Sequence, residues 1–245
     1  MRIVFAGQVP KDPAHPGAIE DAFALDAEAG LAAISDGASE SFDSRRWAGL
    51  LVEEYVGNPV LNWTWLDRAI GDYAAQFSHD KLSWAQEASF ERGSFATLLG
   101  LRHFSRQECL EVFCVGDSIA VILDGEGRRS ELAHPDYDCS EAFRRRPVLF
   151  STKPEMNRPI KEPGFFEGNR FSWPLAGPGP WSVLCMTDAF AAWALGREEQ
   201  DRPVWQRLSA VRDQSDLETL VSHTRRSREM RIDDVTFVHL SFGGT

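Results

Sequence analysis

The feature that most constrains the fold of this chain is a set of short apolar runs that meet acidic residues at their ends. Four such acidic signatures follow one another: Glu20-Asp21, Ser35-Asp36-Gly37, Thr187-Asp188 and Asp233-Asp234. The adjoining runs have the length of buried strands. Carboxylates repel one another and resist burial, so a fold that gathers them needs cations. Mg²⁺ and Mn²⁺ prefer oxygen ligands, and the pattern therefore indicates a divalent metal site at the strand edges.

Runs typical of strands and segments with apolar residues at helical spacing occur in separate blocks along the chain. Strands are expected at residues 3–7, 22–26, 31–35, 95–101, 111–115, 119–123, 181–186 and 235–240. One helix is expected to begin at a capping Asp43 or Ser44, and a second after Thr64 as its cap. Later helices are expected near 188–195, 204–211 and 217–221.

The order of these elements predicts an α+β fold rather than a doubly wound parallel sheet, because strands and helices do not alternate strictly. Runs of strands separated by helix pairs fit two antiparallel sheets packed face to face, with the helices outside. Residues 1–245 are expected to form a single domain. Residues 134–180 are rich in Pro, Arg, Gly and Asn without periodicity, which is typical of a functional flap.

Charge and cysteine content narrow the classes of partner and compartment. A formal net charge of -11 argues against a nucleic-acid partner and against an anionic membrane. The four cysteines show no zinc-type spacing, and Cys114 and Cys185 lie inside apolar runs, as in proteins of a reducing compartment. The sequence shows no signal peptide and no apolar run long enough to span a bilayer, so a cytoplasmic location is expected.

Six short motifs in a fixed order carry a resemblance to a known family. They are Ile19-Glu20-Asp21-Ala22-Phe23, Ala33-Ile34-Ser35-Asp36-Gly37, Gly93-Ser94-Phe95-Ala96-Thr97, Val115-Gly116-Asp117-Ser118, Met186-Thr187-Asp188 and Asp233-Asp234-Val235-Thr236. Together they resemble the metal-dependent protein phosphatases of the PP2C (PPM) family, in the form of a bacterial-type catalytic domain. The resemblance covers essentially the whole chain and implies a four-layer αββα sandwich with metals at one end of the sheets.

The resemblance also implies a set of metal ligands. Two Mn²⁺ or Mg²⁺ ions would be held by Glu20, Asp36, the carbonyl of Gly37, Asp188 and Asp233. Asp36 would bridge the two ions, and Asp21 would support a bound water. Asp36, Asp188 and Asp233 would be the catalytic set. Asp117 matches a position that helps to bind a third, weaker metal in bacterial relatives.

The implied activity is hydrolysis of phosphoserine or phosphothreonine in a protein, by a water or hydroxide that bridges the two metals. The expected partners are a phosphorylated protein and a cognate Ser/Thr kinase. No covalent phosphoenzyme is needed, which agrees with the lack of a nucleophile signature. The sequence has no GxSxG elbow and no P-loop, and Cys185 is not followed by a tyrosine-phosphatase loop.

Three positions depart from the family pattern. Pro16 stands where relatives usually carry an arginine that grips the substrate phosphate, and neither Lys11 nor His15 reproduces its fork geometry. Ala38 stands where eukaryotic relatives have a histidine proposed as the general acid. Ala189 replaces a usual glycine. These departures predict slow catalysis or an unusual phosphosubstrate.

Simpler interpretations remain for each residue taken alone. Asp36 fits a turn former, Asp233 a strand cap, and Asp117 a bulge between two strands. The arginines 144–146 fit either phosphopeptide docking or solvated surface, whereas those at 225–231 favour solvated surface that balances nearby acids. The competing function is a pseudophosphatase that binds a phosphoprotein or a kinase. A two-metal nuclease is disfavoured by the acidic composition.

Overall fold

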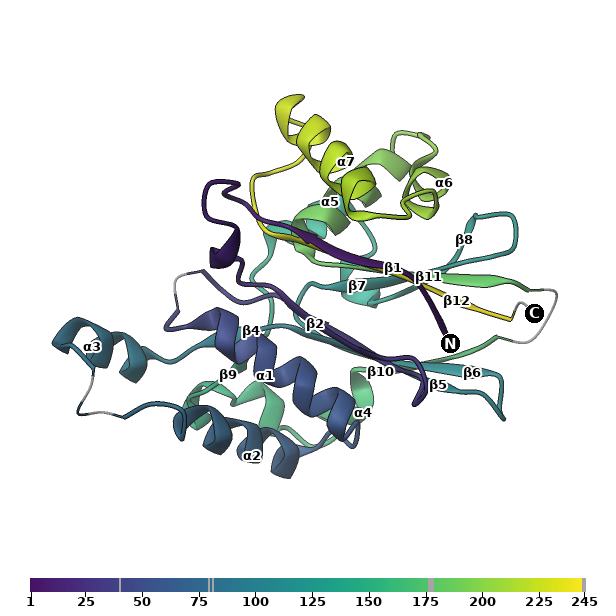
Figure 1. Ribbon diagram of the computed structural model, residues 1–245. Coiled ribbons are helices and arrows are strands. Elements are labelled where there is room, and N and C mark those ends of the chain that lie inside the picture. Colours follow the sequence, from purple (N-terminus) through teal and green to yellow (C-terminus); the bar gives the residue numbers. More distant parts are fainter. Residues whose placement is uncertain (40, 79, 81, 176–178, 244–245) are drawn as a thin grey trace.

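The computed structural model describes residues 1–39, 41–78, 80, 82–175 and 179–243. Its strands are β1 (Arg2–Val9), β2 (Ala22–Asp26), β3 (Leu31–Ser35), β4 (Phe95–Ala96), β5 (Leu98–Phe104), β6 (Cys109–Val115), β7 (Ile119–Leu123), β8 (Arg129–Ala133), β9 (Phe150–Ser151), β10 (Arg170–Pro174), β11 (Trp181–Met186) and β12 (Val235–Phe242). Within the described residues they form two five-stranded antiparallel sheets, β1-β12-β11-β7-β8 and β10-β6-β5-β3-β2, and a small pair β4-β9 (Figure 1).

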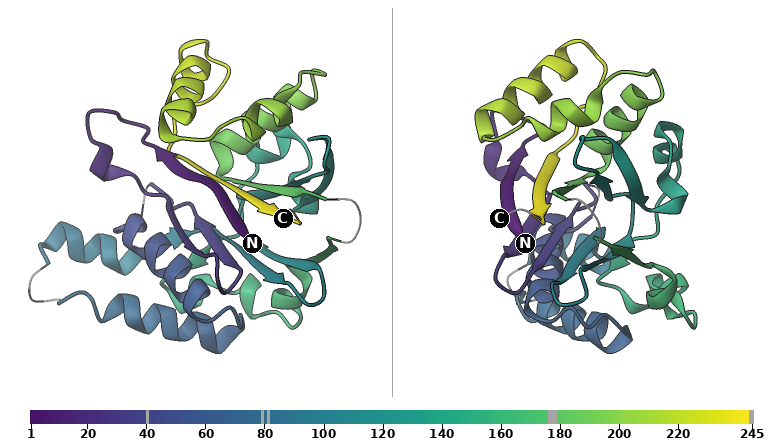
Figure 2. Two further views of the ribbon diagram at one scale, coloured as in Figure 1. Left: turned by 45° about the vertical axis from the view of Figure 1, so that its right-hand side comes forward. Right: turned by 90° about the vertical axis from the view of Figure 1, so that its right-hand side faces the viewer.

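Helices cover the outer face of each sheet. The helices of the described structure are α1 (Ser44–Gly57), α2 (Trp63–Ala74), α3 (Trp84–Arg92), α4 (Phe165–Gly168), α5 (Asp188–Glu198), α6 (Val204–Ser209) and α7 (Gln214–Arg226). Figure 2 shows α1 and α2 on one side of the molecule, and α6 and α7 on the other, with both sheets between them. The predicted α+β class and its four-layer αββα sandwich are confirmed. In the described part of the chain, no helix combines the length and the apolar character needed to cross a membrane.

Three apolar clusters occupy the three interfaces between layers. The β1–β12 sheet packs against α5, α6 and α7 through residues such as Phe190, Leu208 and Phe237. The two sheets meet through mostly aliphatic side chains, among them Ile34, Leu101 and Val183. Strands of both sheets therefore alternate between two apolar interfaces, which explains why runs such as 31–35 and 119–123 are buried along their whole length.

The packing of α1 and α2 on the second sheet follows from their apolar stripes. Trp47 and Tyr55 of α1 are buried against the sheet, and the indole of Trp47 donates a 2.9 Å hydrogen bond to the carbonyl of Phe150. The cap of α1 is Asp43, as expected. The cap expected at Thr64 is wrong, because the Asn62 side chain accepts the Trp65 N–H and α2 begins one residue before Thr64.

Several elements of the structure lie in segments where no such element was expected, among them α3, β9, α4 and β10. Helix α3 has no buried residue and therefore no apolar stripe to reveal it. Residues 134–180 are less irregular than predicted, because β10 adds to the edge of a sheet beside β6, and short 3₁₀ turns, β9 and α4 precede it. Residues 176–178 of this segment lie outside the described residues.

Candidate metal centre

The acidic signatures converge at one end of the sandwich. Asp36 follows β3, Asp117 lies between β6 and β7, and Asp188 begins α5 directly after β11. Carboxylate oxygens of these three residues lie within 4.8 Å of one another. Glu20 and Asp233 lie outside this trio in the described structure, and each is next to a cation. The structure thus brings together carboxylates from connections that belong to both sheets.

Asp36 is positioned by Thr97, which lies between β4 and β5, as well as by its own turn. The Thr97 hydroxyl accepts a 2.8 Å hydrogen bond from the Asp36 N–H, and the Thr97 N–H donates to the Asp36 carbonyl at 2.9 Å. The same hydroxyl lies 3.0 Å from that of Ser118. One threonine therefore connects the turn that carries Asp36 to the turn that carries Asp117.

Two glycines allow the backbone of the site to approach its neighbours closely. A Cβ on Gly37 would lie 2.8 Å from the Glu20 carbonyl oxygen and 2.9 Å from the Ser44 backbone. Gly116 has a φ of +103°, and a Cβ there would lie 2.4 Å from the Thr97 side chain. The turns beside Asp36 and Asp117 therefore require glycine.

Glu20 is held by two hydroxyls and a lysine. Ser44 and Ser39 each donate to its carboxylate at 2.6 Å, and the Lys11 ammonium contacts the same group. Burial opposes the charge of Glu20, but these hydrogen bonds, that of Lys11 first, keep its pKa below the usual value. His15 instead contacts Asp12 on the exposed surface, so Lys11 is the one of these two residues that faces the acids.

Asp21 and Asp234 connect the chain segments around the centre through hydrogen bonds. The hydroxyls of Thr187 and Thr236 donate to Asp21 at 3.0 and 2.8 Å, which joins β2 to β11 and β12. Burial and the charge of Asp234 raise the pKa of Asp21 to about 7, against the effect of these hydroxyls. Asp234 is 4% exposed and accepts the backbone N–H groups of Lys11 and Glu20 at 2.7 and 2.9 Å.

Asp188 and Asp233 share an arginine. Arg231 contacts Asp188 Oδ2 through Nη2, and its Nε lies 3.8 Å from Asp233 Oδ2. Asp188 Oδ1 is buried and has no hydrogen-bond partner among the described residues. Below them, Arg225 donates to the carbonyls of Pro10 and Asp233. The expectation that both arginines lie on solvated surface is wrong for Arg225, which is partly buried, and incomplete for Arg231, which balances acids of the centre itself.

The electrostatics of the trio favour a bound cation. Burial, and then the charges of Asp21 and Asp117, raise the pKa of Asp36 well above its usual value. Burial is also the main reason why the pKa of Asp117 is raised to about 6. Oxygen donors, mutual repulsion and the unpartnered Asp188 Oδ1 fit a hard divalent cation.

Sequence reasoning missed the residues that place and neutralise the acids. In the sequence Thr97 is part of a motif that shows no role for it, and Arg231 lies among arginines that are expected on the surface. A signal for Arg231 was available, because it precedes Asp233 by two residues and both flank the start of a buried strand. No comparable signal marks the contact of Thr97 with Asp36, which joins residues 61 positions apart.

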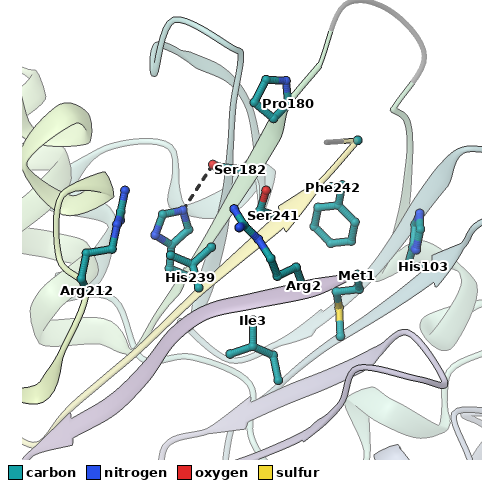
Figure 3. Close-up of a pocket in the computed structure, with 12 residues that line it drawn as sticks. Met1, Arg2, Ile3, His103, Pro180, Ser182, Arg212, His239, Ser241 and Phe242 are labelled. Carbon is teal, nitrogen blue, oxygen red and sulfur yellow. Dashed lines mark hydrogen bonds between the residues drawn. The ribbon is translucent and has the colours of Figure 1, made fainter. Parts of the chain in front are cut away.

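A separate cavity of about 810 Å³ lies at the opposite end of the sheets, lined by the first residues of β1 and the last of β12. Figure 3 shows His239 beside Arg2 and Arg212, with its hydrogen bond to Ser182 at 3.2 Å. Burial and the charges of Arg212 and Arg2 lower the pKa of His239 to about 4. Because the described lining of this cavity contains no carboxylate, it does not offer the ligands found at the acidic end.

Comparisons with known proteins identify the fold. No protein-family model and no curated protein sequence matches the chain. Among solved structures, it is similar to a variant of a bacterial serine phosphatase (TM-score 0.62, 18% identity, 98% of each chain covered). It is also similar to the serine/threonine phosphatase Stp1 from Staphylococcus aureus (TM-score 0.61, 17% identity, 100% of this chain and 96% of that chain). A third match is the PPM Ser-Thr phosphatase MsPP from Mycobacterium smegmatis in complex with cacodylate (TM-score 0.57, 15% identity, 99% and 100%). The chain therefore has the fold of the bacterial PP2C (PPM) protein phosphatases.

Proposed function

We propose that this protein is a metal-dependent phosphoserine/phosphothreonine protein phosphatase. The observation that carries the proposal is the meeting of Asp36, Asp117 and Asp188 within 4.8 Å at one end of a PP2C-type sandwich. Carboxylates gathered at such a distance repel one another unless cations bind them. The likeness of the whole chain to bacterial serine/threonine phosphatases supports the same activity.

The proposed ligands of Mn²⁺ or Mg²⁺ are the side chains of Glu20, Asp36, Asp188 and Asp233 and the carbonyl of Gly37, with Asp117 for a third ion. When bound, such ions supply the Lewis acidity that makes water nucleophilic at neutral pH and stabilises charge on a transferred phosphoryl group. Asp36, Asp188 and Asp233 are the proposed catalytic carboxylates.

The other residues of the centre position these ligands and supply positive charge. Thr97 fixes the backbone of Asp36, and Asp21 links three strands beneath the ligands. Lys11 and Arg231 are cations at the rim, with side chains 32% and 43% exposed, where the phosphate of a substrate would arrive. This rim, which carries two cations, fits a phosphorylated side chain better than an apolar substrate.

The remaining features of the proposal concern the whole protein. We propose one phosphatase domain over residues 1–245, with a flap at about 134–180 beside the centre. Its substrate would be a phosphorylated protein, and its counterpart a Ser/Thr kinase in a signalling pathway. The four cysteines are free, which supports a reducing compartment such as the cytoplasm.

Hydrolysis of a phosphothreonine peptide in Mn²⁺ tests the proposal. We expect Asp36→Asn to lower kcat/KM by about 10³-fold, since a metal-assisted step depends on several kcal/mol of charge stabilisation. Asp72→Asn, which removes the same charge from an exposed position of α2, should leave the rate unchanged. Equal rates for the Asp36→Asn and unmodified proteins would contradict the proposed centre.

One observation favours a second function, that of a pseudophosphatase. Lys11 and Arg231 already neutralise Glu20, Asp188 and Asp233, so part of the centre is satisfied without added cations. A binder of this kind would retain a phosphopeptide in Mn²⁺ without hydrolysing it. Release of phosphate by the unmodified protein, and its loss in Asp36→Asn, would exclude this second function.

A further inference from the structure

Arg231 connects acids that belong to different elements of the centre. It contacts Asp188 at the start of α5 and Asp233 before β12. Its charge also offsets part of the repulsion acting on Asp36 and Asp117. A single guanidinium therefore interacts with four of the clustered carboxylates.

The surroundings of Arg231 differ from those of a structural arginine. Arg225 is partly buried and holds the backbone carbonyls of Pro10 and Asp233, which fixes two segments of chain. In the described structure, the polar contacts of Arg231 are limited to the two carboxylates, and its side chain is 43% exposed. Loss of these contacts would leave the backbone hydrogen bonds of the segment intact.

The side chain of Arg231 also has room to move. It lines a cavity of about 370 Å³ beside α5, together with Ala189, Gly196 and Arg197. The arginine belongs to the connection between α7 and β12 and precedes Asp233 by two residues. Its guanidinium can therefore leave the carboxylates without repacking the core and still remain near the centre.

We propose that Arg231 alternates between two anionic partners: the Asp188–Asp233 pair in the metal-free protein, and the substrate phosphate in the metal-loaded protein. This inference rests on the proposed phosphatase function. A divalent cation at Asp188 and Asp233 places positive charge beside the guanidinium, and like charges a few ångströms apart repel strongly in a partly buried site. The displaced guanidinium has the planar fork that binds a phosphate through two parallel hydrogen bonds.

The first test is titration of the metal-free protein with Mn²⁺ by calorimetry. Arg231→Gln removes the competing cation, so we expect about fivefold tighter Mn²⁺ binding. In EDTA the same variant should unfold about 2–4 °C lower than the unmodified protein, because Asp188 and Asp233 lose their counter-ion. Arg226→Gln is the matched control, since Arg226 is exposed and, among the described residues, its guanidinium bonds only within its own helix, to the Ser222 carbonyl. Unchanged or weaker Mn²⁺ binding by Arg231→Gln would overturn the proposal that Arg231 competes with the metal for Asp188 and Asp233.

The second test is binding of inorganic phosphate to the metal-loaded protein. Arg231→Gln should weaken it about 10- to 100-fold, because a charge-assisted pair of hydrogen bonds is lost. Arg231→Lys keeps the charge and loses the fork, so it should restore the unfolding temperature in EDTA but not the affinity for phosphate. Equal phosphate affinity of the unmodified protein, Arg231→Gln and Arg231→Lys would overturn the proposal that Arg231 binds phosphate in the metal-loaded protein.

Neither binding measurement depends on turnover, so the proposed phosphatase function and the proposed role of Arg231 are tested separately. An unmodified protein that binds no Mn²⁺ would refute the proposed phosphatase function. An unmodified protein that binds Mn²⁺ and phosphate, with neither affinity sensitive to Arg231, would refute only the role of this arginine.

Discussion

At the scale of single residues, the centre is defined by groups that place the acids as much as by the acids themselves. Thr97 donates to and accepts from the backbone of Asp36 and also reaches Ser118, so it sets the separation of Asp36 and Asp117. The acids were visible in the sequence because each adjoins a strongly apolar strand. Thr97, Lys11 and Arg231 could not be paired with them, because such contacts depend on how distant strands align.

Asp117 gives the metal-free protein a specific response to pH. Its pKa in the fold, about 6, is above the usual value, so the fold favours the protonated acid. The corresponding stability is fully present below pH 4 and is lost as the pH rises through 6. In EDTA we therefore expect Asp117→Asn to be more stable than the unmodified protein at pH 8, and the difference to shrink towards pH 4.

Thermal unfolding at several pH values in EDTA measures this difference. Groups that do not interact with Asp117 contribute equally to both proteins, whereas Asp36, whose pKa is raised by the charge of Asp117, adds to the difference in the same direction. A variant that is less stable than the unmodified protein at pH 8 would mean that Asp117 is stabilised as a carboxylate in the metal-free fold. Excess Mn²⁺ should reverse the order of stability at pH 8, because the unmodified protein then gains a ligand that the variant has lost.

At the scale of elements, apolar runs with clear ends made some parts of the fold predictable. The expected boundaries of the strands β2, β3, β7 and β11 agree with the structure, because each run is apolar and ends at a turn or an acid. Helix α3 was missed because it buries no side chain. Its signal was the capping box of Ser83 and Gln86. Strand β10 was missed because it is an edge strand that ends at Pro174 and carries Arg170 and Ser172 among its aromatics.

The packing of α1 on its sheet depends on a glycine in β5, Gly100. A Cβ on Gly100 would lie 2.4 Å from the ring of Tyr55, which is 2% exposed. We expect Gly100→Ala to lower the free energy of unfolding by about 1–3 kcal/mol, because the ring must move within a filled core. Urea unfolding in EDTA measures this change without a contribution from metal.

Gly71→Ala in α2 is the control for this prediction. Its Cβ would meet nothing within 4 Å, and alanine favours a helix interior by roughly 0.5–1 kcal/mol over glycine. The two substitutions should therefore change stability in opposite directions. Similar effects of both would mean that the contact with Tyr55 is not what requires glycine at position 100.

At the scale of the whole molecule, the formal net charge of -11 is distributed unevenly between the two ends of the sandwich. One end gathers carboxylates, whereas the described lining of the cavity at the other includes Arg2, Arg212 and His239. The sequence predicted the α+β class from its blocks of strands and helices and the acidic end from the acids beside the strands, and the resemblance to PP2C phosphatases implied the four-layer order. The cationic lining of the far end comes from residues far apart in the chain and was not anticipated.

Metal should stabilise the whole fold, because the proposed ligands come from both sheets. At a free Mn²⁺ concentration of about 100 times the Kd, the gain is about 2.7 kcal/mol, which corresponds to roughly 5–11 °C in Tm for a chain of this size. Scanning calorimetry with increasing Mn²⁺ measures the shift, and EDTA should reverse it. Asp36→Asn should show little of it, and an equal shift in that variant would place the stabilising ion elsewhere.

The connection between β6 and β7 gives such an ion a mechanical consequence. The short connection of residues 116–118 carries the chain from β6 in one sheet to β7 in the other, with Asp117 in the middle. An ion bound at this crossing would fix the distance between the two sheets at the acidic end of the sandwich and would leave the opposite end unrestrained. Removal of the ion by a chelator would then weaken the packing between the two sheets rather than the order of a single loop.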